Sequence, residues 1–154
     1  MMKLIYALLL IAIIQADDLY DETRIYNAII ALKAKYPEGT PWTNANSYSW
    51  GFNVARGLGY GGFTGSGCAA FAMIASDAAF GDIPAYKKED KDGIKVGDIL
   101  RIKNNTHSVI VLQKTSTKDQ YVIAEGNYNA SIHWGRIINL SETGFNYRFT
   151  RYKS

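Results

Sequence analysis

The hydrophobic pattern of this chain changes at Gly97, and this change limits the folds that the chain can adopt. Before this glycine, apolar residues recur at helical spacing, whereas after it they form the short runs typical of strands. The strand-like runs are Asp98–Lys103, Ser108–Lys114, Tyr121–Glu125, Ile132–Ile138 and Phe145–Tyr152. Turns predicted at 104–105, 116–119 and 126–129 separate several of these runs. Helices followed by an antiparallel meander predict an α+β domain, with the helices packed against one face or end of the sheet.

Two helices are predicted in the N-terminal half. The first runs from Asp21, which caps its start, to Lys35, and Pro37 ends it. Its apolar face is formed by Ile25, Ile29 and Leu32. The second helix runs from Ser66 to Phe80. Between the two, residues 38–67 are rich in Gly, Asn, Ser and aromatic residues, and we predict mostly ordered loop, with a short helix possible in residues 47–58.

The first sixteen residues have the pattern of a signal peptide. Lys3 precedes an apolar run at residues 4–14, and the small residue Ala16 stands just before an acidic pair. The run is shorter than the roughly 20 residues that a membrane-spanning helix needs. We therefore expect residues 1–16 to be cleaved and residues 17–154 to form a single secreted domain. An uncleaved anchor or a buried helix is the alternative.

Charge and apolar pattern also indicate which partners to expect. The formal net charge of +3 falls to +2 when Lys3 leaves with the signal peptide, and the chain has no basic cluster. Nucleic acid is therefore not an expected partner. No second long apolar run follows residues 4–14, so we expect no stable membrane insertion after cleavage. We expect the mature protein to be a monomer.

Cys68 is the only cysteine of the chain, although secreted proteins usually pair their cysteines as disulfides. It stands where the glycine-rich loop 61–67 enters the apolar helical stretch 68–75. The positive end of a helix favours a thiolate, Ser66 can act as N-cap, and the Cys68 N–H is a candidate oxyanion donor. We therefore predict that Cys68 is a nucleophile, with a buried structural cysteine as the alternative.

Two histidines are available as the base that such a thiol needs. His107 follows a turn and opens the apolar strand 108–112, so rigid backbone holds it at the edge of the sheet. The other histidine, His133, lies in the later segment 132–136. We take His107 as the base, although either residue can instead be a hydrogen-bonded surface histidine.

Glu125 is the candidate for the residue that orients the imidazole. It ends the strand after the one that His107 opens, and in an antiparallel pair these two ends lie at the same edge of the sheet. Asn127 is the second candidate. The alternative for Glu125 is a solvated carboxylate in a turn.

Four short segments of the chain together resemble the NlpC/P60 superfamily of papain-like cysteine hydrolases, and its CHAP-type branch most closely. They are Gly67–Ala72, Val96–Leu100, Thr106–Val111 and Ala124–Tyr128. Members of the family resemble this order: a cysteine at a helix start, a Gly-Asp turn into a strand, a histidine heading the next strand, and a Glu-x-Asn after it. The resemblance covers about residues 38–152. It implies a papain-like fold, with N-terminal helices packed on a C-terminal antiparallel sheet or half-barrel.

The resemblance also implies an activity, the hydrolysis of amide or peptide bonds in bacterial peptidoglycan. By matching position, Cys68 is then the nucleophile, His107 the base and Glu125 the orienting residue. The chain departs from the family at residues 67–69, where Gly-Cys-Ala stands in place of the Asp-Cys-Ser of many members.

Aromatic residues make up 13% of the chain, and many of them flank the predicted catalytic residues. Flat rings stack on sugars and on peptide stems. The candidates for lining a substrate groove are Trp42, Trp50, Tyr60 and Trp134. Tyr60 and Asn127 are further candidates for completing the oxyanion or orienting group. Arg136 can pair with a substrate carboxylate or lie on the surface of a strand, and at least half of the aromatic residues are expected to pin loops to the core.

The leading hypothesis is a secreted cysteine amidase or endopeptidase that works through an acyl-enzyme. The two histidines and one cysteine form no cluster with the spacing of metal ligands, so neither a metal nor another cofactor is expected. A catalytically inactive secreted protein that binds glycan or peptide on the same scaffold is the alternative. Acyl transfer by the same three residues is a third hypothesis.

Overall fold

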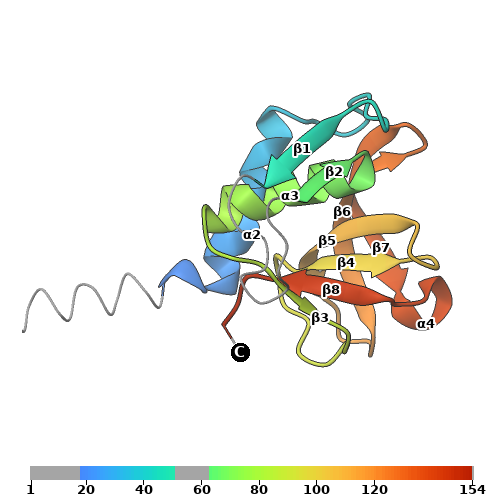
Figure 1. Cartoon of the computed structure of the whole chain (residues 1–154). Helices are drawn as coiled ribbons and strands as arrows, with labels where there is room; N and C mark the ends of the chain where they lie inside the picture. The colour runs from blue at the N-terminus through green and yellow to red at the C-terminus, as the bar shows by residue number, and fades with distance from the viewer. Residues whose placement is uncertain (1–17, 51–62, 154) are drawn as a thin grey trace, which may run out of the picture.

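The computed structural model describes residues 18–50 and 63–153, which form an α+β fold (Figure 1). Within these ranges, helices lie against a six-stranded antiparallel sheet, and a separate two-stranded ribbon packs on helix α3. The predicted α+β class is therefore confirmed. The predicted signal peptide, residues 1–16, and the groove candidate Tyr60 lie outside the described residues.

The helical layer begins close to where the sequence predicts it. Its members are α2 (Glu22–Ile30), the 3-10 helix η1 (Ala31–Ala34) and α3 (Cys68–Phe80). The short α4 (Leu140–Thr143) lies apart from this layer and buries Leu140 on the other face of the sheet. Asp21 caps α2 as predicted, because its carboxylate accepts a hydrogen bond from the Arg24 N–H at 2.8 Å. The predicted cap of α3 is wrong: Ser66 belongs to a strand, and Gly67 is the N-cap residue, with no side-chain cap bond.

The large sheet has the strand order β3-β8-β4-β5-β6-β7, and every neighbouring pair is antiparallel. Its strands are β3 (Tyr86–Lys88), β4 (Ile99–Ile102), β5 (His107–Lys114), β6 (Gln120–Tyr128), β7 (Ser131–Asn139) and β8 (Tyr147–Thr150). Strands β4 to β7 form the predicted meander, and β8 returns to pair with β4. The sequence analysis missed β3, which is too short to show an apolar alternation.

Strands β1 (Ser47–Trp50) and β2 (Phe63–Ser66) form an antiparallel ribbon within the region predicted as loop with a possible short helix. That prediction is wrong for these residues, because serine and aromatic residues alternate in β1, as suits a strand with one face on a helix. The Tyr48 hydroxyl donates to Asp77 of α3 at 2.7 Å, and Trp50 is 1% exposed. The ribbon thus packs on α3, as helix α2 also does (Figure 1).

The predicted turn at residues 126–129 is also wrong in its position. Strand β6 continues through an irregularity between Glu125 and Tyr128, and the chain reverses at Asn129 and Ala130. Both reversal residues have positive φ, 50° and 57°. Because the strand runs past Glu125, this carboxylate lies within the sheet and not in a solvated turn.

Apolar side chains pack in two cores on opposite faces of the sheet. Ile110 and Ala124 pack against the helices with Phe71 of α3, whereas Val109 and Ile123 point to the other face. The face that α3 turns to the sheet is rich in alanine, which lets its backbone approach β5 and β6 closely.

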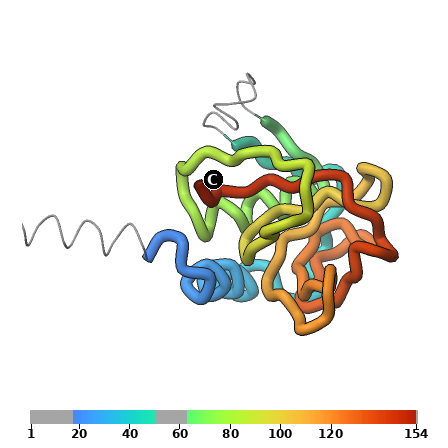
Figure 2. The backbone as a smooth tube through the Cα atoms, turned by 90° about the horizontal axis from the view of Figure 1, so that it is seen from below, coloured from blue at the N-terminus to red at the C-terminus, as the bar shows by residue number. Residues whose placement is uncertain are grey.

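The C-terminal end of the chain runs beside the segment that follows α3 (Figure 2). Arg151, which is 1% exposed, donates to Ser76 Oγ and to the Ile83 carbonyl, each at 2.8 Å. It also forms an ion pair with Asp77 at 2.9 Å. These contacts fix α3 against the sheet, and its N-terminal residue, Cys68, meets the start of β5.

Candidate active site

A tightly held turn places Cys68 as the first residue of α3. The Gly67 N–H donates to the Asn46 carbonyl at 2.9 Å, and the Gly67 carbonyl accepts from the Trp42 indole at 2.8 Å. Gly67 has a φ of 55°, and a Cβ atom there would overlap the side chain of Asn44. Only glycine fits both the conformation and the space, so the sequence Gly-Cys fixes where the thiol emerges.

The Cys68 thiol receives hydrogen bonds and positive charge from three residues. Its Sγ accepts from the Ser108 N–H at 3.4 Å and lies 4.0 Å from Nη1 of Arg101. Burial opposes ionisation, but hydrogen bonds from His107 and Ser108, with the charges of His107 and Arg101, lower the pKa of Cys68 to about 7. A large fraction of the thiol is therefore thiolate at neutral pH.

His107 is the first residue of β5 and is 8% exposed. Its Nε2 lies 3.7 Å from Oε2 of Glu125, an ion-pair distance that is longer than a hydrogen bond. This nitrogen is buried and has no hydrogen-bond partner among the described residues. Burial lowers the pKa of His107, but the neighbouring Cys68 and the charge of Glu125 outweigh burial and raise it.

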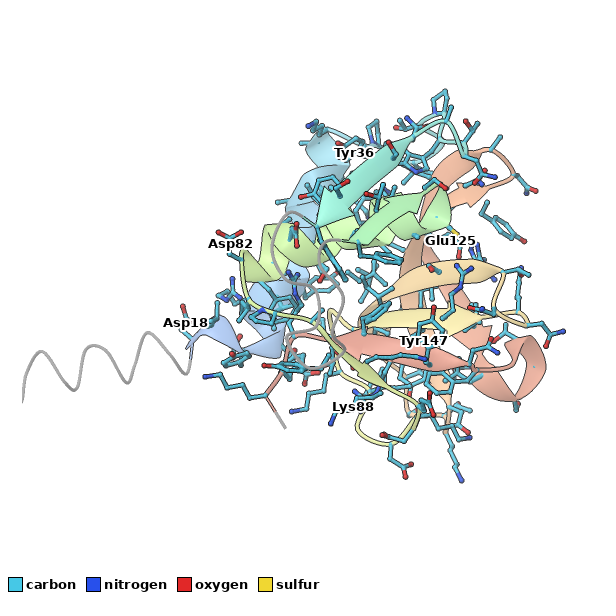
Figure 3. The ribbon with its side chains drawn as sticks, viewed as in Figure 1. Asp18, Tyr36, Asp82, Lys88, Glu125 and Tyr147 are labelled. Carbon is cyan, nitrogen blue, oxygen red and sulfur yellow. The ribbon has the colours of Figure 1, made fainter. Side chains whose placement is uncertain are left out.

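Glu125 is fully buried in β6. Ile110 pairs with Ala124 across β5 and β6, so the next residue, Glu125, comes beside the start of β5. Burial raises the pKa of Glu125, but the neighbouring His107 and the hydrogen bonds and charge of Arg136 outweigh burial and lower it. The carboxylate is thus charged and faces the imidazole, near the end of the helical layer (Figure 3).

Arg136 has its partner inside the protein. Its Nε donates to Glu125 Oε1 at 3.0 Å and its Nη2 donates to Oε2 at 2.6 Å. The guanidinium also lies 4.5 Å from the centre of the Tyr128 ring. The sequence suggests that Arg136 can pair with a substrate carboxylate. In the structure it instead binds the carboxylate of Glu125, which faces His107.

The remaining predicted residues fall at different places. Trp42 is 7% exposed and packs in the core, while the half-buried Trp134 donates its indole N–H to the Tyr36 carbonyl at 2.8 Å. Neither lines the cavity beside Cys68, whereas Trp50 does. Asn127 donates its amide to Asn44 Oδ1 at 2.9 Å.

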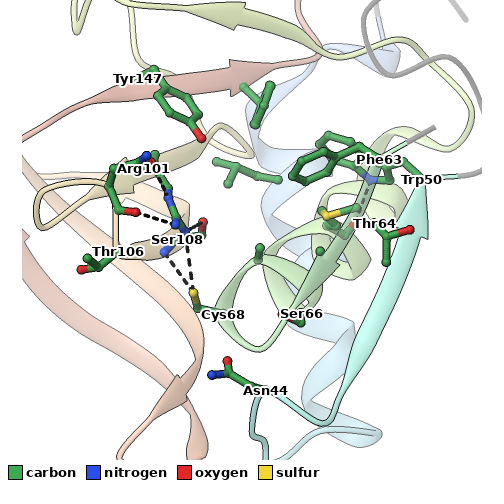
Figure 4. A pocket seen from close by; sticks show the side chains of 16 residues that line it. Asn44, Trp50, Phe63, Thr64, Ser66, Cys68, Arg101, Thr106, Ser108 and Tyr147 are labelled. Carbon is green, nitrogen blue, oxygen red and sulfur yellow. Dashed lines mark hydrogen bonds between the residues drawn. The ribbon is translucent and has the colours of Figure 1, made fainter. Parts of the chain in front are cut away.

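A cavity of about 340 Å³ opens beside the thiol (Figure 4). Cys68, Arg101 and Ser108 lie at one end of it, and Trp50 and Phe63 lie at the other. Asn44 lines the cavity next to Cys68.

Sequence reasoning missed Asn44, Arg101 and Ser108. A signal for two of them was present, because β4 and β5 were predicted as successive strands joined by a short turn. Their antiparallel register places Arg101 directly opposite Ser108, the residue after His107. Asn44 lies in the irregular segment before β1, and no local pattern marks it.

Comparison with family models, with curated proteins and with solved structures finds no significant match to this chain. In the part of the chain that the structure describes, no helix has the length and apolarity to cross a membrane. Within the same residues, no three His, Cys, Asp or Glu side chains form a group that could hold a metal ion.

Proposed function

We propose that this protein is a cysteine hydrolase that cleaves an amide or peptide bond through a covalent acyl-enzyme. The observation that carries the proposal is the meeting of three groups: a thiol with a lowered pKa, a buried imidazole, and a buried carboxylate 3.7 Å from that imidazole. A thiolate paired with an imidazolium is the form of cysteine that attacks carbonyl carbon.

In the proposed reaction, Cys68 Sγ attacks the carbonyl carbon of the substrate and forms a sulfur–carbon bond. As the carbon–nitrogen bond breaks, the imidazolium of His107 gives its proton to the leaving amine. The neutral imidazole then takes a proton from water, which attacks the thioester carbon. The sulfur–carbon bond breaks, the carboxylic acid leaves, and Cys68 and His107 return to thiolate and imidazolium. The charge of Glu125 stabilises the imidazolium form of His107 in both steps.

Two donors are available for the oxyanion that forms on the carbonyl oxygen. The N–H of Cys68 lies in the first turn of α3, where backbone N–H groups have no acceptor within the helix. Asn44 accepts the Asn127 amide at its Oδ1, which leaves its own NH₂ group as a donor beside the thiol. Asn127 thus has the role of orienting Asn44 in this proposal.

We further propose membership of the NlpC/P60 superfamily, with a papain-like arrangement and a CHAP-type relationship. The order of elements supports it: Cys68 begins a helix, His107 begins a strand that packs against this helix, and Glu125 lies on the next strand. By that resemblance the substrate is the peptide part of bacterial peptidoglycan. The leader-like residues 1–16 support secretion as the route to it.

A digest of purified peptidoglycan tests the proposal. Wild type, Cys68→Ala and His107→Ala are incubated with it, and the released fragments are identified by mass spectrometry. We expect new amino and carboxyl ends only with the wild type. Equal release by the wild type and Cys68→Ala rejects the proposal.

A non-catalytic binding protein on the same scaffold remains the second candidate. The observation that favours it is that Glu125 makes its close contacts with Arg136 and stands 3.7 Å from His107. Iodoacetamide distinguishes the two candidates: a catalytic Cys68 reacts rapidly below pH 7, whereas an inert thiol does not.

A further inference from the structure

We infer that the cavity beside Cys68 selects substrates that carry a carboxylate next to the scissile amide, and that Arg101 recognises it. This inference rests on the proposed function and adds a substrate class to it. Three observations support it. They are the position of Arg101, the hydrogen bonds of its guanidinium together with the absence of an ion-pair partner among the described residues, and the lack of acidic residues in the described lining of the cavity.

Arg101 presents its charge beside the attacking sulfur. It lies on β4 opposite Ser108, donates to Ser108 Oγ at 2.9 Å, and has Nη1 4.0 Å from Cys68 Sγ. A carbonyl carbon bonded to that sulfur brings the groups next to it within reach of the guanidinium. The charge therefore lies where it acts on the residue adjacent to the scissile bond.

The guanidinium is held from behind by a neutral residue. Its Nε donates to Asn105 Oδ1 at 2.9 Å and its Nη2 donates to the Asn105 carbonyl at 2.6 Å. Asn105 is in turn anchored, because its N–H donates to Asn146 Oδ1 at 2.8 Å. Arg101 is thus pre-oriented before a ligand arrives, which lowers the entropy cost of binding.

Arg101 has no ion-pair partner among the described residues, and it has donors to spare. Arg136 and Arg148, by comparison, pair with Glu125 and Asp98. A guanidinium carries five N–H donors. One N–H on Nη2 of Arg101 has no acceptor within the described residues, while Nη1 donates to Ser108 Oγ and makes a long contact of 4.0 Å with Cys68 Sγ. A half-buried guanidinium with free donors is a binding site for a carboxylate.

Among the described residues that line the cavity, Arg101 is the one cationic side chain that can bind a carboxylate. None of these described lining residues is acidic. The far end of the cavity is aromatic, with the rings of Trp50, Phe63 and Phe149 in mutual contact at 5.8 to 6.4 Å between centres. That end suits an apolar group, so the carboxylate belongs at Arg101.

Two alkylating reagents test the inference without knowledge of the natural substrate. In iodoacetate and iodoacetamide alike, Cys68 Sγ displaces iodide and forms a sulfur–carbon bond. The reagents differ in carrying a carboxylate or a neutral carboxamide on the carbon that is attacked. The ratio of their second-order rate constants therefore measures recognition of the carboxylate, because a change in thiolate fraction affects both rates equally.

We expect the iodoacetate-to-iodoacetamide ratio to fall roughly 3- to 10-fold from the wild type to Arg101→Met, the effect of losing one charge pair near a surface. Arg101→Lys retains part of the preference. The matched control is Lys33→Met, which removes the same charge from η1, outside the cavity, and leaves the ratio unchanged. Arg101→Gln, which can still bond to Asn105 and Ser108, replaces Arg101→Met if that variant does not fold.

An equal ratio in the wild type and the Arg101 variants overturns the inference. If both reagents then still label Cys68 rapidly below pH 7, the proposed hydrolase stands without this selectivity. A shifted ratio in a protein that releases no fragment from peptidoglycan has the opposite meaning, because anion selectivity holds while the proposed substrate fails.

Discussion

At the scale of single residues, the chemistry of Cys68 results from two opposed effects. Burial favours the neutral thiol, whereas the hydrogen bonds from His107 and Ser108 favour the thiolate and prevail. The pKa in the folded state, about 7, lies below the ordinary value of a thiol. The thiolate therefore stabilises the folded state fully above the ordinary thiol pKa, and this contribution is lost as the pH falls through about 7.

The first prediction concerns the pH at which Cys68 becomes reactive. We expect the rate of alkylation by iodoacetamide to rise with a midpoint near pH 7, where the thiolate forms. In His107→Ala the midpoint moves up toward about 8.5, the ordinary value, because one hydrogen bond and one positive charge are lost. Rates measured from pH 5 to 10 give both midpoints. Identical midpoints in the two proteins contradict the pairing of Cys68 with His107.

The second prediction concerns the charge of Glu125. Glu125→Gln keeps the size of the side chain but removes the charge that raises the pKa of His107. We expect this pKa to fall, and turnover to fall by about 100-fold or more, because a smaller fraction of His107 can give a proton to the leaving amine. The pKa of His107 is read from its imidazole resonance in an NMR titration. Glu142→Gln, an exposed change on α4, is the control and leaves both quantities as they are.

At the scale of elements, the two ends of α3 make a matched pair. Gly67 and Gly81 flank the helix with nearly the same backbone, φ and ψ of 55° and −121° against 62° and −139°. An added Cβ meets nothing within 4 Å at Gly81 but overlaps Asn44 at Gly67. The conformation thus demands glycine at both ends, while only the N-terminal end is also crowded by a residue of the cavity.

The third prediction follows from that difference. Gly81→Ala costs about 1–3 kcal/mol of stability, because it puts a side chain in a positive-φ conformation that glycine alone adopts readily. Gly67→Ala has the same cost plus about 1–3 kcal/mol for displacing Asn44. It also lowers turnover, because Asn44 and Cys68 move apart. Urea unfolding and peptide hydrolysis of both variants measure this, and equal losses of stability would show that Asn44 yields without cost.

At the scale of the whole molecule, buried arginines tie distant segments together. Arg151, near the C-terminus, bonds to Ser76 and Asp77 of α3, and Arg148 of β8 pairs with Asp98, which precedes β4. Such pairs add little when complete, but removing one partner leaves a buried group without its counterpart. The helix that carries Cys68 is thus held at its far end by the last residues of the fold.

The fourth prediction tests this tie. Arg151→Met removes the buried donors of Ser76 Oγ and the Ile83 carbonyl, and it leaves the partly exposed Asp77 with the Tyr48 hydroxyl. We expect a loss of about 3 kcal/mol, the sum of these lost hydrogen bonds. Lys91→Met is the matched control, because its ion pair with Asp119 lies at the surface, and the unfolding midpoint should not change. Thermal unfolding followed by circular dichroism measures both. A similar midpoint for the two variants would mean that the sheet holds α3 without Arg151.

Much of the fold could be predicted because its signals are local. Ile25 and Ile29 mark a helix by their spacing, and the alternation in residues 98–103 and 145–152 marks strands at the positions of β4 and β8. Cys68 and His107 were found in the same way, since each stands at a visible boundary between a loop and a regular element. Ser66 is not the cap that the local sequence predicts, because its pairing with Ser47 in the ribbon is not local.

The sequence alone therefore determined the α+β class, the order of the meander, and the placement of Cys68 in the first turn of a helix and of His107 at the start of a strand. Only the tertiary structure decided that Arg136 pairs with Glu125, that Arg101 lies close to the Cys68 sulfur, and that Asn44 lines the same cavity as Cys68. The reason is physical: periodic burial is encoded by residues a few positions apart, whereas the partner of a charged or amide group depends on which distant segment the packed core brings next to it.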